Sequence, residues 1–131
     1  MSEVMRFRVE KLIRDRLPQI MRDQGLQVFD RRLEDDEFVA ELKRKLVEEA
    51  AEASDAGPDD LPGELADVLE VILALAQATG LTLAEIEARR MAKHAERGGF
   101  EDRVYNAAVE APAGLPAADY YLARPHQYPR L

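Results

Sequence analysis

Residues 45–71 read KLVEEAAEASDAGPDDLPGELADVLEV, in which two helical patterns flank a Gly-Pro break. Glu49 and Glu52 are three positions apart in the first pattern, and Glu64 and Asp67 have the same spacing in the second. Since a helix advances about 100° per residue, each pair lies on one side of its helix. Two such helices packed together would bring four carboxylates to one point, which predicts a site for a hard cation.

The surrounding sequence predicts three core helices. They run from about Asp35 or Asp36 to Ala56, from an N-cap at Asp59 or Asp60 to Gly80, and from Thr82 to about Arg97. Gly57-Pro58 and Gly98-Gly99 are typical stops for the first and third helices. Thr82 and Glu85 have the spacing of a capping box.

The two ends of the chain have weaker patterns. RFRVEKLIRDRLPQIMRDQG, residues 6–25, predicts a short extended start and then a helix from about Arg14 to Asp23, and QVFDRRL, residues 27–33, predicts a short strand or an extended linker. Residues 111–131 hold four prolines and three of the four tyrosines without a helical or strand period, which predicts an irregular tail.

These patterns predict an all-α protein. We expect a single domain over residues 1–131, with its core at about 8–103 and its tail at about 104–131. The second core helix is apolar nearly all round, which suits burial in a bundle. The expected architecture is therefore a four-helix-bundle-type core that is completed by oligomerisation.

Composition narrows the function classes. The chain has 131 residues, no cysteine and a formal net charge of −8. Without cysteine there is no disulfide and no thiolate metal site, and a strongly acidic protein is a poor partner for a nucleic-acid polymer. Since no apolar run approaches about 18 residues and the N-terminus lacks the core of a signal peptide, we expect a cytoplasmic protein without a membrane partner.

The motif acids fall among core positions. The apolar stripe expected on the first core helix comprises Leu42, Leu46, Ala50 and Ala53. On a helical wheel with Phe38 at about 0°, Glu49 falls at about 20°, on the same side of the helix as this stripe. Glu52 falls at about 320°, at the margin of the stripe. A carboxylate removed from water without a partner costs several kcal/mol or more, so we expect Arg, Lys or a metal beside these acids. All-oxygen ligands suit Mg²⁺ or Mn²⁺ better than Zn²⁺.

The sequence also resembles a known family. EExxE at residues 48–52 followed by ExxD at 64–67 resembles the signature of the all-α nucleotide pyrophosphohydrolases, the MazG-like superfamily that includes phosphoribosyl-ATP pyrophosphohydrolases and dimeric dUTPases. KLIRDRLPQI at 11–20 is similar to the opening of one MazG-like subgroup, and RGGF at 97–100 resembles the end of that subgroup's third core helix. The resemblance covers about residues 8–103.

The resemblance implies Mg²⁺-dependent hydrolysis of a nucleoside triphosphate, or a related nucleotide, to the monophosphate and pyrophosphate. It makes Glu49, Glu52, Glu64 and Asp67 the metal ligands, with Mn²⁺ as a substitute for Mg²⁺. It gives Glu48 a catalytic role as a base or a water-orienting residue, although a plain surface glutamate is an alternative because the wheel turns Glu48 away from the stripe. House-cleaning of noncanonical nucleotides is a further hypothesis from the family alone.

Two basic groups are candidates for holding substrate phosphates. The first comprises Arg90, Lys93 and Arg97 on the third core helix, and the second comprises Lys11, Arg14 and Arg16 near the N-terminus. Either group could instead neutralise the acidic surface, and the first could neutralise the C-terminal helix dipole. The similarity of the RDR opening to the MazG-like subgroup favours a binding role for the second group.

Members of the family that the sequence resembles complete their bundles as dimers or tetramers, so we expect a homodimer or a higher homo-oligomer. Two alternatives to the main function stay open. One is the phosphoribosyl-ATP pyrophosphohydrolase of histidine biosynthesis, and the other is a non-catalytic helical regulator that binds metal or nucleotide. The base and sugar of the nucleotide do not follow from the sequence.

Overall fold

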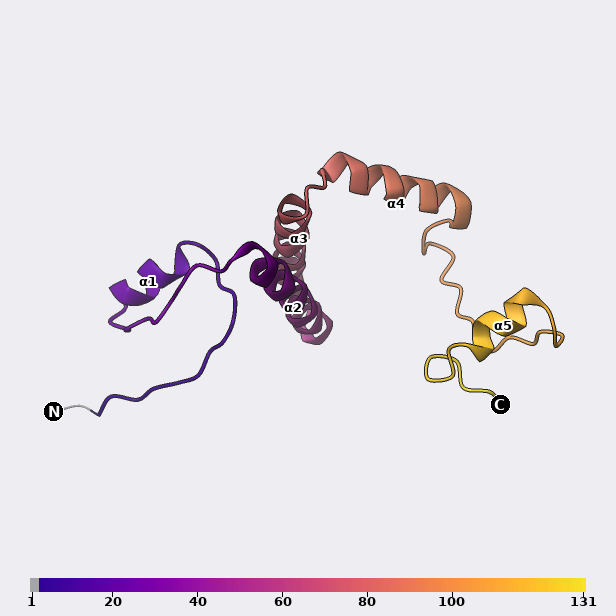
Figure 1. Cartoon of the computed structure of the whole chain (residues 1–131), viewed down its shortest axis with the longest axis horizontal. Coiled ribbons are helices and arrows are strands. Elements are labelled where there is room, and N and C mark those ends of the chain that lie inside the picture. Colours follow the sequence, from indigo (N-terminus) through magenta and orange to yellow (C-terminus); the bar gives the residue numbers. More distant parts are fainter. Residues whose placement is uncertain (1–2) are drawn as a thin grey trace. The chain divides into compact units, whose positions relative to one another are not determined.

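The computed structural model describes residues 3–131, which form five helices and no strand (Figure 1). The helices are α1 (Leu17–Asp23), α2 (Asp35–Asp55), α3 (Leu61–Ala78), α4 (Leu83–Arg97) and α5 (Pro116–Leu122). The predicted all-α class is confirmed, and α2, α3 and α4 correspond to the three predicted core helices.

Helices α2 and α3 lie side by side and pack against each other (Figure 1). The short connection over residues 56–60 makes them antiparallel neighbours. Their contact buries Leu42 of α2, which is 3% exposed, and Val71 and Ala76 of α3. Ala50, which we expected in the buried stripe, is exposed, so that prediction was wrong. Among the residues of the stripe, Ala50 lies furthest from the centre of the stripe. At this position the surface of the helix faces water.

Helix α4 begins and ends at the residues that the sequence predicts. The Glu85 backbone N–H donates a hydrogen bond of 3.1 Å to Thr82 Oγ1, which caps the first turn. At the other end, Gly98 has a φ of +79°, the left-handed conformation that glycine adopts readily after a helix. Local chemistry therefore sets both ends of α4.

One prediction near the N-terminus was wrong in detail, and another is narrowed to one of its alternatives. Helix α1 begins at Leu17 rather than Arg14, because Pro18 lies in its first turn and has no N–H to donate to the Arg14 carbonyl, as an earlier helix start would require. Residues 27–33 form no strand, which leaves the linker as the remaining alternative for this segment. A strand needs a neighbour to pair with, and the described residues provide none.

The expectation of a wholly irregular tail was also wrong, because the tail contains α5. Pro116 lies in the first turn of this helix, where backbone N–H groups have no acceptor within the helix, so a proline costs no hydrogen bond there. Ala118 is the buried residue of the helix. The rings of Tyr120, Tyr121 and Tyr128 pack together, with centroids between 4.9 and 6.0 Å apart. This aromatic cluster stabilises a helix that is too short to form by itself.

The chain divides into two compact units, the first ending at Lys93 and the second beginning at His94. The expectation of one domain with a tail from about residue 104 stays a prediction. Among the helices that the structure describes, none is by itself long and apolar enough to cross a membrane. A cytoplasmic location also stays a prediction.

Candidate metal centre

The packing of α2 on α3 brings the motif acids together within the first unit. Glu49 lies on the side of α2 that contacts α3 and is only 7% exposed, as its position on the wheel predicts. Glu64 and Asp67 are half-buried in the first two turns of α3. Glu52 is exposed, in agreement with its predicted place at the margin of the stripe.

The carboxylates form two overlapping groups. Ligand atoms of Glu49, Glu64 and Asp67 all lie within 4.8 Å of one another, and so do ligand atoms of Glu48, Glu49 and Glu52. Glu49 belongs to both groups. We call the five residues of the two groups the acid cluster, namely Glu48, Glu49, Glu52, Glu64 and Asp67.

Burial and like charge act together on Glu49. Burial, and then the charge of Glu52, raise the pKa of the Glu49 carboxyl, whereas Lys45 has the opposite effect. Lys45 Nζ lies 3.4 Å from Glu49 Oε1. Glu49 Oε2 is buried without a hydrogen-bond partner, and so is Oε2 of Glu64. Native proteins seldom leave buried oxygens without a partner, so each of these two oxygens could accept a hydrogen bond from water or bind a cation.

Glu48 has a different environment from the other acids. Lys11 Nζ donates a hydrogen bond of 2.9 Å to Glu48 Oε1, and Lys45 Nζ lies 3.7 Å from Glu48 Oε2. The hydrogen bond from Lys11 lowers the pKa of the Glu48 carboxyl, and the Lys45 charge adds to this effect. Two lysines therefore keep Glu48 ionised.

Lys45 is the one residue of this site that the sequence reasoning missed. Its side chain is largely buried and pairs with Glu48 and Glu49, which follow it by three and four positions on α2. This spacing places charged side chains side by side on any helix, so the K-x-x-E-E pattern could have identified Lys45.

Of the N-terminal basic group, the structure brings Lys11 and Arg14 to the acid cluster. Arg14 Nη2 donates a hydrogen bond of 2.7 Å to Asp67 Oδ1. Arg16 is exposed and makes no ion pair among the described residues. Two of the three predicted cations thus pair with motif acids.

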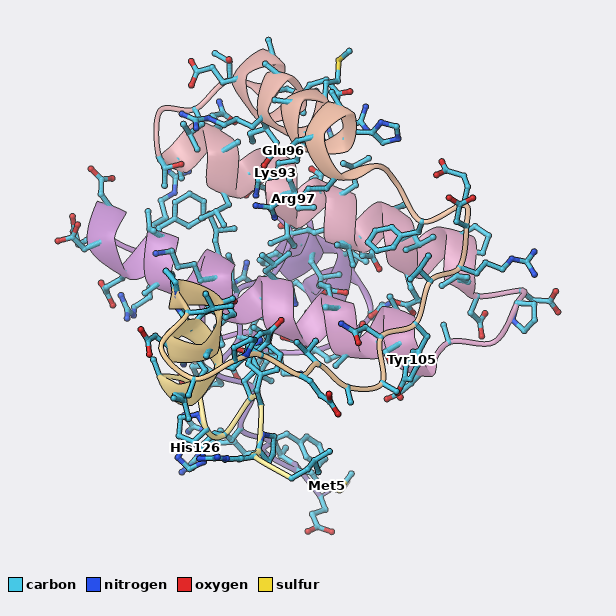
Figure 2. All side chains as sticks on the ribbon, turned by 90° about the vertical axis from the view of Figure 1, so that its right-hand side faces the viewer. Met5, Lys93, Glu96, Arg97, Tyr105 and His126 are labelled. Carbon is cyan, nitrogen blue, oxygen red and sulfur yellow. The ribbon has the colours of Figure 1, made fainter. Side chains whose placement is uncertain are left out.

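Arg90 and Lys93, the α4 basic residues of the predicted phosphate-binding group that lie in the first unit, make no ion pair with the acid cluster among the described residues of that unit. Arg90 pairs with Glu87 of its own helix. Lys93 and Arg97 are exposed one turn apart on α4 (Figure 2), and Arg97 belongs to the second unit. A shallow hollow beside α4 is lined by Leu81, Ile86 and other residues of that region, but by none of the motif acids.

The donor set of the acid cluster fits Mg²⁺ or Mn²⁺. All its donors are carboxylate oxygens, the preferred ligands of hard cations, and two of them are buried without a partner. Glu49, Glu64 and Asp67 form one group that could hold an ion, and Glu52 belongs to the other group with Glu48 and Glu49. Comparisons of the chain with protein-family models, with curated proteins and with solved structures found no match.

Proposed function

We propose that the protein is a Mg²⁺-dependent nucleotide pyrophosphohydrolase, which converts a nucleoside triphosphate or a related nucleotide to the monophosphate and pyrophosphate. The observation that carries the proposal is the pair of buried, unpartnered oxygens, Glu49 Oε2 and Glu64 Oε2, at the centre of a set of carboxylates. The protein's own lysines and arginines leave these oxygens without a partner. A divalent cation would supply one.

The residue types suit phosphoanhydride hydrolysis. A cation held by Glu49, Glu52, Glu64 and Asp67 would neutralise phosphate charge and lower the pKa of a bound water. Formation of a monophosphate and pyrophosphate requires water to attack the α-phosphorus. The bond from that phosphorus to the bridging oxygen breaks, pyrophosphate leaves with that oxygen, and the proton of the water passes to solvent. The chain's part is to position the phosphates and the water, which requires no nucleophilic side chain.

We assign Glu48 to orienting the water rather than to removing its proton. Its lowered pKa makes it a weak base, and a general base works best when its pKa is near the working pH. An ionised carboxylate fixed by Lys11 and Lys45 is instead a rigid hydrogen-bond acceptor. A water that donates a hydrogen bond to Glu48 would keep its oxygen lone pairs free for attack.

The phosphates of the nucleotide need positively charged side chains close to the acid cluster to bind them. Lys11 and Arg14 are the best candidates because they already lie beside Glu48 and Asp67. Arg16 lies in the same segment. Arg90 and Lys93 are weaker candidates, since no ion pair among the described residues links them to the acid cluster, and Arg97, in the second unit, is a candidate from the sequence alone.

We further propose that two copies of the chain form the four-helix-bundle-type core. Four leucines recur every fourth position along α3 and are between 36% and 53% exposed, namely Leu61, Leu65, Leu69 and Leu73. This spacing forms a stripe along one side of the helix, and a contiguous apolar surface of this kind is typical of an interface. The α2–α3 pair of a second copy of the chain, which carries the same leucine stripe, would cover this surface.

The test is product analysis with a panel of nucleotides. The purified protein would be incubated with Mg²⁺ and canonical and damaged nucleoside triphosphates, dUTP and phosphoribosyl-ATP, and pyrophosphate would be measured separately from orthophosphate. We expect pyrophosphate release that Glu49→Gln abolishes. Glu70→Gln, a change of the same kind at an exposed acid of α3, is the matched control and should retain the activity.

The panel also separates the alternative functions. Turnover of phosphoribosyl-ATP alone would favour the histidine-biosynthesis enzyme, and preference for damaged bases would favour house-cleaning. Binding of Mg²⁺ without turnover of any nucleotide would refute the hydrolase and favour a regulator.

A further inference from the structure

The N-terminal basic segment, residues 8–16, connects the two helices of the acid cluster. Lys11 binds Glu48 of α2 at 2.9 Å, and Arg14 binds Asp67 of α3 at 2.7 Å. Both partners are motif acids, and both cations come from the group predicted to hold phosphate. The same side chains therefore have two possible anionic partners, the protein's acids and a substrate.

The two ion pairs are exposed and weak enough to exchange. The side chains of Lys11 and Arg14 are 53% and 61% exposed, respectively. Exposed ion pairs contribute little to stability. A divalent cation that takes up Asp67 together with the buried oxygens of Glu49 and Glu64 has a larger electrostatic advantage than one exposed guanidinium.

The segment's cations satisfy only the outer part of the acid cluster. Glu48 faces two lysines and Asp67 faces Arg14, whereas Glu49 Oε2 and Glu64 Oε2 stay buried without a partner. Asp67 is thus the one member of the Glu49–Glu64–Asp67 group that an N-terminal cation occupies. At this residue, an incoming ion and Arg14 require the same carboxylate.

We propose that Arg14 and a divalent cation compete for Asp67, so that binding of the cation releases Arg14 and makes its guanidinium available to a substrate phosphate. Lys11 remains on Glu48, which lies outside the group that contains Asp67, and this contact keeps the segment beside the site. Arg14 is then a positioning residue whose availability depends on the metal. The inference rests on the proposed function, because it requires a cation at the acid cluster.

The test is a Mn²⁺ titration followed by electron paramagnetic resonance of the free ion. Wild type would be compared with Arg14→Gln and with Arg8→Gln, which removes the same charge from the same segment at an exposed residue without an ion pair among the described residues. We expect Arg14→Gln to bind Mn²⁺ about two- to fivefold more tightly, the range that loss of one exposed ion pair allows. Arg8→Gln should stay close to wild type.

Two further readouts distinguish competition from a structural role. Arg14→Gln should raise the KM for the nucleotide while it tightens Mn²⁺ binding, whereas loss of a merely structural contact would weaken both. In wild type, which avoids any folding defect of a variant, the guanidinium NMR resonances of Arg14 should shift when Mg²⁺ is added, because the ion pair with Asp67 is broken.

The outcomes separate this inference from the proposed function. If wild type binds Mn²⁺ but the affinities of Arg14→Gln and Arg8→Gln are equal, or if the guanidinium resonances of Arg14 do not shift with Mg²⁺, the competition is refuted and the metal centre stands. If wild type binds no Mn²⁺, the proposed metal centre and the competition are refuted together.

Discussion

Replacing Glu49 by glutamine should stabilise the metal-free protein and remove its stabilisation by Mg²⁺. Glu49 is 7% exposed, one of its oxygens has no partner, and burial raises the pKa of its carboxyl. Glutamine has nearly the same volume without the charge, so the substitution relieves the buried charge and opens no cavity. It also removes a ligand that both carboxylate groups share.

The expected magnitude follows from the surroundings of the carboxylate. A buried polar group without a partner costs about 1–3 kcal/mol, and a charged one costs more. Lys45, 3.4 Å from the other oxygen, offsets part of this penalty. We therefore expect metal-free Glu49→Gln to be more stable by about 1 kcal/mol near neutral pH, which corresponds to roughly 4 °C in Tm. Mg²⁺ at about 100 times its Kd should stabilise wild type by about 2.7 kcal/mol and the variant by little.

Thermal unfolding with and without Mg²⁺, at several pH values, measures both effects. Because the folded Glu49 carboxyl has a pKa above its ordinary value of 4.5, the metal-free wild type should lose stability as pH rises above 4.5, through the folded pKa. Glu49→Gln lacks this loss, so its advantage should grow over the same pH range. The reasoning is refuted if the metal-free variant is no more stable than wild type, or if Mg²⁺ still stabilises the variant. Glu70→Gln is the matched control.

Three further substitutions test other parts of the structure. Glu48→Gln should destabilise the protein by about 0.5–1 kcal/mol at pH 7, but not at a pH well below 4.5. Lys11 lowers the pKa of Glu48, so the stability that the ionised carboxylate contributes is lost as pH falls through this lowered pKa. Urea unfolding at both pH values measures the difference. Leu42→Ala, at a side chain only 3% exposed, should cost about 2–4 kcal/mol in urea unfolding, and a negligible loss would contradict the α2–α3 core. Leu69→Asp should convert the oligomer to a monomer in size exclusion with light scattering, whereas a wild-type mass of 14.7 kDa would itself refute the oligomer.

The long helices could be predicted from the sequence because local residues define their ends. The Thr82 hydroxyl caps α4, and Gly98 adopts the positive φ that terminates it. Helix α5 could not be predicted in the same way. It has seven residues and adjoins several prolines, and its stability depends on packing among Tyr120, Tyr121 and Tyr128, which is a tertiary effect.

The acids of the candidate site could be predicted, but their cations only in part. The spacing of Glu49 and Glu52, and of Glu64 and Asp67, gives the shared helix faces directly. Lys45 could have been found from the same rule. The pairing of Arg14 with Asp67 joins residues that are far apart in the chain, so no local pattern encodes it, and only the packing of the N-terminal basic segment on α3 reveals it.

An anomalous difference map from crystals grown with MnCl₂ would locate the ion directly. We expect a peak bordered by the carboxylates of Glu49, Glu64 and Asp67, within coordination distance of Glu49 Oε2 and Glu64 Oε2. A map with no peak at these oxygens, whether Mn²⁺ binds elsewhere in the protein or not at all, would contradict the metal centre.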